Sequence, residues 1–158
     1  MAEQSITLRP ATEDDQDFLL TLFKSSRGDD LRGLGWSEDR ISEFLAMQYE
    51  AQQNFVATDH PELNDQIVLL EGTPVGHLAV EQRPNEIRLV DLALLPEHRS
   101  SGTGALLIQE LQTQAAAAKR PLRAQVIRFN RAVGLFERLG FRRTSETGTH
   151  FQMEWLPE

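Results

Sequence analysis

The chain has 158 residues, of which 40% are hydrophobic and 25% charged, a composition typical of one folded domain rather than a disordered chain. It contains no cysteine, which excludes disulfides, thiolate metal sites and a cysteine nucleophile. The net charge of −8 argues against general binding to nucleic acid, and no segment resembles a signal peptide or a membrane span, so we expect a cytoplasmic protein.

The charge is unevenly distributed along the chain. Residues 95–145 hold nine basic and three acidic residues, whereas the other residues have a net charge of −14. The basic segment would attract a phosphorylated ligand, and the acidic remainder would suit a cationic one. The alternative is that the charges are distributed by chance and that both charged surfaces simply face solvent, without a charged ligand.

The first part of the chain predicts one strand and two helices. Ser5–Arg9 alternates apolar and polar residues and ends before Pro10, as a strand does. Thr12 is a candidate N-cap of a helix that ends at Gly28, and Ser37 begins a second helix. Each helix has one apolar face, made of Phe18, Leu19, Leu22 and Phe23 in the first and of Ile41, Phe44, Leu45 and Tyr49 in the second.

Three consecutive strands are predicted in the middle of the chain. Turn residues at 72–73 and 83–85 separate three apolar runs, and this spacing indicates a hairpin followed by a further strand. The runs are Gln66–Glu71, Val75–Glu81 and Ile87–Leu94.

The last part of the chain predicts a crossover and a terminal hairpin. Gly104–Lys119 has apolar residues at helical spacing, and the strand Leu122–Arg128 follows it. Asn130 is a candidate cap of a short helix that ends at Gly140. Two closing strands come last, Phe141–Arg143 and His150–Trp155.

This order of elements predicts an α/β fold. Its mixed, mostly antiparallel sheet has one central parallel βαβ crossover, at residues 87–128, and flanking helices. We expect residues 1–158 to form a single domain. We also expect His150–Trp155 to be an edge strand through which two copies could pair as a homodimer.

The loop that leads into the crossover helix carries the clearest sign of chemistry. Residues 94–104 read LLPEHRSSGTG, so a strand ends and a helix begins within one short loop. Gly102 and Gly104 allow a close approach to a ligand, and the first turn of the helix offers N–H donors and a positive dipole end. This arrangement suits a pyrophosphate, and a plain strand-to-helix turn is the alternative. The chain contains no glycine-rich loop of the nucleotide-hydrolase type. Its own glycine loop lacks the third glycine of the dinucleotide-binding fingerprint, so a nicotinamide-dependent oxidoreductase is the weakest alternative.

Two motifs resemble signatures of the GNAT superfamily of N-acetyltransferases. Residues 99–104, RSSGTG, resemble its (Q/R)-x-x-G-x-(G/A) loop, and residues 130–141, NRAVGLFERLGF, resemble its Asn-led helix that ends in Leu-Gly-Phe. The two motifs lie about 30 residues apart in the family's order, and the element order matches the family fold over nearly the whole chain. The resemblance implies that residues 1–158 form a GNAT-like N-acetyltransferase domain.

The resemblance also implies acetyl-CoA as the co-substrate and no metal. Acetyl-CoA would lie where Ile87–Leu94 and Leu122–Arg128 separate, with its pantetheine arm bonded to the backbone of Leu92 and Leu94. Asn130 would reach this arm from the other side. The pyrophosphate would bond to the N–H groups of Arg99, Ser100, Ser101, Gly102, Thr103, Gly104 and Ala105.

By the same resemblance, a primary amine attacks the thioester directly in a ternary complex. Asp91 is the first candidate general base and Glu81, on the adjacent strand, the second, and either could instead be an ordinary strand charge. Phe136 stands where the family often has a tyrosine that protonates the departing thiolate, so solvent or another group would supply that proton. A non-catalytic acyl-CoA-binding or sensing module is therefore the alternative. The expected acceptor is a small-molecule amine or a lysine, with neither nucleic acid nor a membrane as partner.

Overall fold

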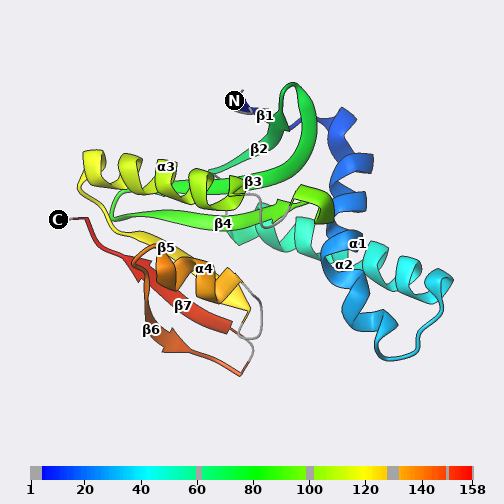
Figure 1. Cartoon of the computed structure of the whole chain (residues 1–158). Helices are drawn as coiled ribbons and strands as arrows, with labels where there is room; N and C mark the ends of the chain where they lie inside the picture. The colour runs from blue at the N-terminus through cyan, green and yellow to red at the C-terminus, as the bar shows by residue number, and fades with distance from the viewer. Residues whose placement is uncertain (1–4, 60–61, 99–101, 128–131, 149, 158) are drawn as a thin grey trace. The chain divides into compact units, whose positions relative to one another are not determined.

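The structure is a computed structural model that describes residues 5–59, 62–98, 102–127, 132–148 and 150–157 (Figure 1). Its helices and strands follow the predicted order. The strands are β1 (Ile6–Pro10), β2 (Leu63–Leu70), β3 (Thr73–Arg83), β4 (Glu86–Leu94), β5 (Leu122–Ile127), β6 (Arg142–Glu146) and β7 (His150–Trp155). The α-helices are α1 (Gln16–Arg32), α2 (Glu38–Asp59), α3 (Thr103–Ala118) and α4 (Ala132–Arg138), and two short 3₁₀ helices are η1 (Glu13–Asp15) and η2 (Pro96–His98).

The seven strands form one mixed sheet in the order β1-β2-β3-β4-β5-β7-β6. The chain divides into two compact units, and β3 and β4 contribute to both. Unit 1 contains Met1–Leu78 and Leu92–Arg99, and unit 2 contains Ala79–Asp91 and Ser100–Glu158. Within the described ranges, no helix is long and apolar enough to cross a membrane.

Unit 1 begins with the cap that the sequence predicts. The Thr12 hydroxyl accepts a hydrogen bond from the Asp14 N–H at 3.3 Å, and the Asp15 carboxylate accepts one from the Thr12 N–H at 2.8 Å. Together they form a capping box. Arg9 donates two further bonds of 2.8 Å to Asp15, and this pairing holds the pKa of the Asp15 carboxyl well below its usual range.

The first helix of unit 1 is longer than predicted. We expected Gly28 to end it, but α1 continues to Arg32. Gly28 is buried within the helix, and the Arg32 guanidinium lies 3.3 Å from the place that a Cβ of Gly28 would occupy. The glycine therefore marks a crowded position, not a helix end. An aromatic cluster joins α1 to α2, in which Phe23 meets Tyr49 and Trp36 meets Phe44 edge to face.

The predicted hairpin of unit 1 is confirmed. Both residues of its turn have positive φ angles, 51° at Glu71 and 84° at Gly72, and this combination is typical of a type I′ turn between antiparallel strands. His77 on β3 contacts Asp65 on β2 at 2.7 Å between Nε2 and Oδ1, within the same hairpin.

Unit 2 contains the single parallel pair of the sheet, between β4 and β5. Strand β5 also pairs with β7, and β7 pairs with β6, both antiparallel. The expectation that His150–Trp155 forms an edge strand is therefore wrong, because β7 lies between β5 and β6 and the edge is β6. All five β6 residues are exposed, and the register shifts between Arg143 and Ser145.

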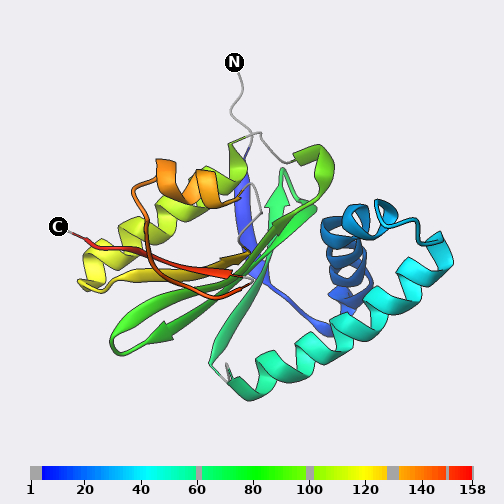
Figure 2. The same ribbon diagram turned by 90° about the horizontal axis from the view of Figure 1, so that it is seen from below.

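The helices of unit 2 cover one face of its strands. Figure 2 shows α3 and α4 on the same side of β5 and β7, and the Gln112 side chain of α3 bonds to the Leu139 carbonyl at 2.8 Å. Gly140 has a φ of 95° and ends the short helix, as predicted. The buried apolar residues of this layer include Ile87, Leu89, Ile108, Leu111, Leu122, Ala124, Phe136 and Met153.

Candidate functional site

The parallel strands β4 and β5 stay in register over only three residue pairs. The pairs run from Ile87 with Leu122 to Leu89 with Ala124, although β4 continues to Leu94 and β5 to Ile127. Since neighbouring parallel strands in a sheet normally exchange hydrogen bonds along their length, these two strands separate toward their carboxyl ends. The separation begins inside unit 2.

The N-terminus of α3 has the geometry of an anion site. Gly102 precedes the helix with a φ of 90°, has no side-chain capping bond, and has open space where a Cβ would be. The Leu106 N–H donates to the Gly102 carbonyl at 3.0 Å. The N–H groups of Thr103, Gly104 and Ala105 precede it, at the positive end of the 16-residue helix. This end of α3 can hold a negatively charged group against backbone donors.

The two leucines expected to contact the pantetheine arm lie in the last part of β4, within unit 1. Leu92 and Leu94 are both half-buried. Gly76 of β3 packs against this segment so closely that a Cβ would lie 2.5 Å from the Ala93 carbonyl oxygen. The Leu95 N–H also donates to the Val75 carbonyl at 2.9 Å, which fixes the end of β4 against β3.

Four of the expected ligand contacts lie outside the described residues. They are Arg99, Ser100 and Ser101 in the loop before α3 and Asn130 before α4. The described part of the predicted pyrophosphate loop is therefore Gly102–Ala105.

The two candidate bases have different surroundings. Asp91 is half-buried on β4, two residues beyond the last pair between β4 and β5. Glu81 is 3% exposed on β3, and its carboxylate accepts a bond from the Arg83 guanidinium. Glu81 is thus held in a buried ion pair, whereas Asp91 lies where the two parallel strands have separated.

A network of charged side chains covers the strand face opposite the buried Ile87 and Leu89 of β4. Glu86 lies among three guanidinium groups, at 3.4 Å from Arg88, 3.6 Å from Arg123 and 3.9 Å from Arg83. Arg123 has a closer partner in Glu154, at 2.8 Å, which raises the pKa of the guanidinium. Arg88 also reaches across β5 to the Gln152 amide oxygen, at 3.3 Å.

The sequence analysis did not single out Arg88. On a strand, an arginine between two apolar residues is typical of an ordinary solvated face. Its position beside the separating strands follows only from the register of β4 with β5, for which the sequence carries no local signal.

Phe136 is 5% exposed on α4, and its ring packs edge to face on Phe141 with 4.9 Å between centroids.

In the part of the chain that the structure describes, no group of three or more His, Asp or Glu side chains is arranged to hold a metal ion.

A scan against protein-family models matches residues 36–157 to the acetyltransferase (GNAT) domain. This match covers more than three quarters of the chain. A search of curated protein sequences gave no significant match.

Several solved structures have the same fold. The PaiA N-acetyltransferase of Thermoplasma acidophilum, crystallised in complex with coenzyme A, superposes with a TM-score of 0.74 at 20% identity, covering 96% of this chain and 99% of that one. An acetyltransferase of Thermus thermophilus gives 0.68 at 20% identity, over 96% of this chain and 97% of that one. The ribosomal-protein-S18-alanine N-acetyltransferase of Escherichia coli gives 0.65 at 15% identity, over 96% and 94%. At these identities the similarity establishes the fold, which agrees with the predicted mixed sheet.

Proposed function

This chain belongs to the GNAT acetyltransferase family, and we propose that it transfers an acetyl group from acetyl-CoA to a primary amine of an acceptor. The observation that carries the proposal is the separation of β4 from β5 beyond Leu89 and Ala124, together with the N-terminus of α3 that follows Gly102. The crystallisation of PaiA with coenzyme A supports acetyl-CoA as the co-substrate.

The residues around the α3 N-terminus fit the pyrophosphate of such a ligand. Gly102–Ala105 would bind it through backbone N–H groups, and Arg99, Ser100 and Ser101 would extend the same loop. The backbone of Leu92 and Leu94 would bond to the pantetheine arm as an added strand.

Acetyl-CoA supplies an acyl group activated as a thioester. The protein holds the acceptor amine against that carbonyl and removes the proton that the nitrogen loses as the N–C bond forms. We assign this proton to Asp91, directly or through one water, because its carboxylate lies on the strand that borders the separation. Glu81, whose carboxylate accepts a bond from Arg83, is the second candidate.

Phe136 has no proton to give to the thiolate that leaves as the C–S bond breaks. We assign that proton to solvent, because a thiolate is a good leaving group that water can protonate.

Asp91→Asn tests the base directly. We expect kcat to fall by about 10²- to 10⁴-fold while coenzyme A binding is unchanged, and unchanged kcat would rule Asp91 out.

The acidic residues outside the basic segment favour an acceptor whose amine is cationic in solution, either a small molecule or a lysine. We also propose that the protein acts in the cytoplasm. We also propose that two copies associate, although the edge strands of the sheet are β1 and β6 and not β7.

The first test is a thermal melt with acetyl-CoA, coenzyme A and NADH in parallel. A ligand at about 100 times its Kd adds roughly 2.7 kcal/mol to the free energy of unfolding, or on the order of 5–10 °C in Tm. We expect this shift with acetyl-CoA and coenzyme A but not with NADH. No shift at millimolar acetyl-CoA would overturn the proposal.

The second candidate function is a non-catalytic acyl-CoA-binding or sensing module, which the phenylalanine at position 136 favours. A panel of primary amines separates the two, with the release of free thiol from acetyl-CoA as the readout. Turnover with any amine eliminates the binding module, and ligand binding without turnover across the panel supports it.

A further inference from the structure

We propose that Glu86 is a positioning residue, whose charge holds β4 and β5 together up to Leu89 and so fixes where the two strands begin to separate. This inference rests on the proposed function, in which acetyl-CoA lies between the separating strands. Two observations carry it. A pair of arginines lies at the end of the β4–β5 pairing, and Glu86 contacts both of them.

The pairing of β4 with β5 ends beside two like charges. Arg88 of β4 and Arg123 of β5 are register partners, and the next pair, Leu89 with Ala124, is the last described one. Neighbouring strands lie about 4.8 Å apart, so these two side chains leave the same face of the sheet side by side. Like charges directly opposite each other on a sheet are destabilising. Without a compensating group, this repulsion would weaken the pairing at the position where the strands are about to separate.

Glu86 supplies the compensating charge. It lies on the same face of β4 as Arg88, two residues away, because Ile87 between them is buried on the other face. Its two carboxylate oxygens contact different strands, Oε2 the Arg88 guanidinium at 3.4 Å and Oε1 the Arg123 guanidinium at 3.6 Å. The second of these contacts crosses from β4 to β5. Glu86 therefore replaces a repulsion between the two strands with an attraction.

The burial of Glu86 makes this contribution larger than that of a surface ion pair. The residue is 7% exposed and the Arg88 side chain 19%, so little water screens their charges. Arg123 has a second carboxylate partner in Glu154, at 2.8 Å. In the described part of the chain, Arg88 has no carboxylate partner besides Glu86. Loss of the Glu86 charge would thus leave Arg88 without a counter-charge opposite Arg123.

The point of separation matters because the proposed cofactor would occupy the gap that begins there. A cleft whose walls are already in place costs less to order on ligand binding than one that must first be formed. Without the Glu86 charge the strands would separate earlier, so acetyl-CoA would have to restore the pairing at Leu89 as it binds. The expected defect is therefore in cofactor binding and not in the chemical step.

Glu86→Gln tests the proposal, because it keeps the shape of the side chain and removes its charge. We expect Kd for coenzyme A and KM for acetyl-CoA to rise by about 10-fold, with kcat within about twofold of the wild type. Adding Arg88→Gln should return both constants to within about threefold of the wild type, since the double variant no longer has like charges opposite each other. Arg88→Gln alone should change them little.

Asp15→Asn is the matched control, because Asp15 is also 7% exposed and also pairs with an arginine, but lies in η1 of unit 1. It should lower the Tm of the ligand-free protein, as Glu86→Gln should, without changing Kd for coenzyme A. An equal rise of Kd in both variants would overturn the proposal, because lost stability would then explain the Glu86→Gln defect.

Hydrogen exchange of the Leu89 N–H gives a readout that needs no ligand. The Ile87 N–H donates to the Pro121 carbonyl at 2.9 Å, so by alternation the Leu89 N–H also faces β5. In ligand-free Glu86→Gln we expect this amide to exchange about 10-fold faster than in the wild type, relative to the Ile108 N–H within α3. The double variant should exchange at nearly the wild-type rate.

The outcomes separate this proposal from the proposed function. A wild type that binds no coenzyme A would overturn the acetyl transfer, while exchange at Leu89 would still decide whether Glu86 holds the strands together. Unchanged binding and unchanged exchange in Glu86→Gln would overturn the positioning role and leave the acetyl transfer intact. A defect that the added Arg88→Gln fails to correct would overturn it too, because the repulsion would then not be its cause.

Discussion

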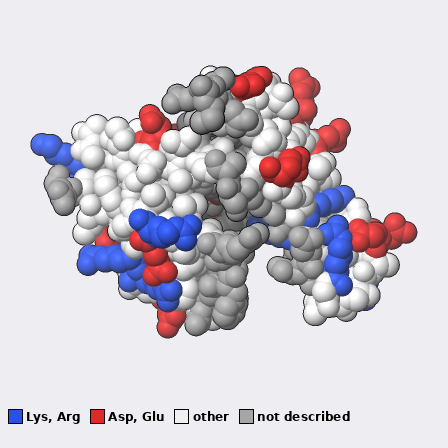
Figure 3. All heavy atoms as spheres, in the orientation of Figure 1, with Lys and Arg blue, Asp and Glu red and all other residues white. Residues whose placement is uncertain are grey.

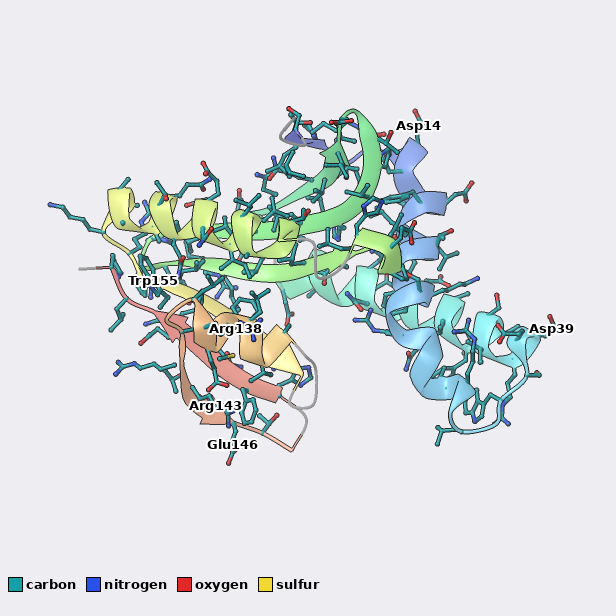
Figure 4. The ribbon with its side chains drawn as sticks, viewed as in Figure 1. Asp14, Asp39, Arg138, Arg143, Glu146 and Trp155 are labelled. Atoms are coloured by element: carbon teal, nitrogen blue, oxygen red, sulfur yellow. The ribbon has the colours of Figure 1, made fainter. Side chains whose placement is uncertain are left out.

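Unit 1 and unit 2 differ in charge. Unit 1 carries 16 acidic and six basic residues, a net charge of −10, whereas unit 2 carries eight acidic and ten basic residues, a net charge of +2. Figure 4 labels Asp14 and Asp39 at the starts of the two long helices of unit 1, and Arg138 and Arg143 on α4 and β6 of unit 2.

The two units also differ in how their charges are used. Figure 3 shows blue and red groups interleaved over the region of β6 and β7, where arginines pair with Glu137 and Glu154. In unit 1 the acidic residues outnumber their possible partners, so a negative field remains. Unit 2, which carries the described part of the predicted pyrophosphate loop, is thus the more positive of the two.

The largest expected effect is the loss of coenzyme A binding when a glycine of unit 2 is replaced by an acidic residue. If binding were kept, the comparison of the two units would be contradicted. Gly104→Glu places a negative charge in the first turn of α3, beside the N–H groups proposed to hold the pyrophosphate. We expect the rise in Tm caused by coenzyme A to disappear and activity to fall by about 100-fold or more. Gly104→Ala is the control, because it adds no charge and the family loop accepts alanine there. An unaltered shift in Gly104→Glu would show that phosphates bind elsewhere.

The next effect concerns the stability of unit 1. A Cβ on Gly76 would lie 2.5 Å from the Ala93 carbonyl and 2.6 Å from the Leu94 side chain, and the backbone cannot yield as a flexible side chain can. We expect Gly76→Ala to lower the free energy of unfolding by about 1–3 kcal/mol, measured by denaturant titration. In unit 2, Gly134→Ala meets only the end of Arg138, at 3.4 Å, and should be neutral or stabilising. If Gly76→Ala and Gly134→Ala lowered the free energy of unfolding equally, the close approach of β3 to β4 at Gly76 would not explain the effect.

A third change tests how tightly the ring of Phe136 is packed in the core of unit 2. Phe136→Tyr adds a hydroxyl to a ring that is packed on Phe141 and 5% exposed, and an unbonded hydroxyl there should cost about 1–3 kcal/mol of stability. Because we assign the thiolate proton to solvent, we expect kcat to be unchanged. A rise of about tenfold or more in kcat would mean instead that a general acid is missing from this chain.

The smallest effect concerns the acid sensitivity of unit 1. Arg9 and the Thr12 N–H lower the pKa of Asp15 in the folded protein below its unfolded value, so the ionised carboxylate stabilises the fold. This contribution is complete above about pH 4, the unfolded value, and is lost as the pH falls toward the folded-state pKa. The Tm of Asp15→Asn should therefore lie below that of the wild type at pH 7, and the gap should shrink below about pH 4. Asp14→Asn, a change at an exposed neighbour, should follow the wild type at all these pH values.

Local patterns predicted the elements well because each depends on neighbouring residues. The Thr12 cap, the left-handed Gly140 and the helical spacing of Gly104–Lys119 are all features of a few adjacent residues. Gly28 misled the prediction of a helix end, since the helix tolerates a glycine where the Arg32 side chain covers it.

Long-range pairing could not be predicted in the same way. Alternation indicated that His150–Trp155 is a strand, but nothing in those six residues says that they pair with β5 on one side and β6 on the other. The site shows the same limit. The glycine loop is visible in the sequence, whereas the point at which β4 and β5 cease to pair depends on which residues of the two strands lie side by side.

The insertion of β7 between β5 and β6 has a consequence for synthesis of the chain. Strand β6 leaves the ribosome before the strand that will hold it, because its neighbour in the sheet is β7 alone. A nascent chain, or any product that stops before His150, leaves one side of β5 without its partner and β6 without a place in the sheet. Folding of unit 2 must therefore wait for β7, and a premature stop codon just before His150 should be as damaging as one in the middle of the domain.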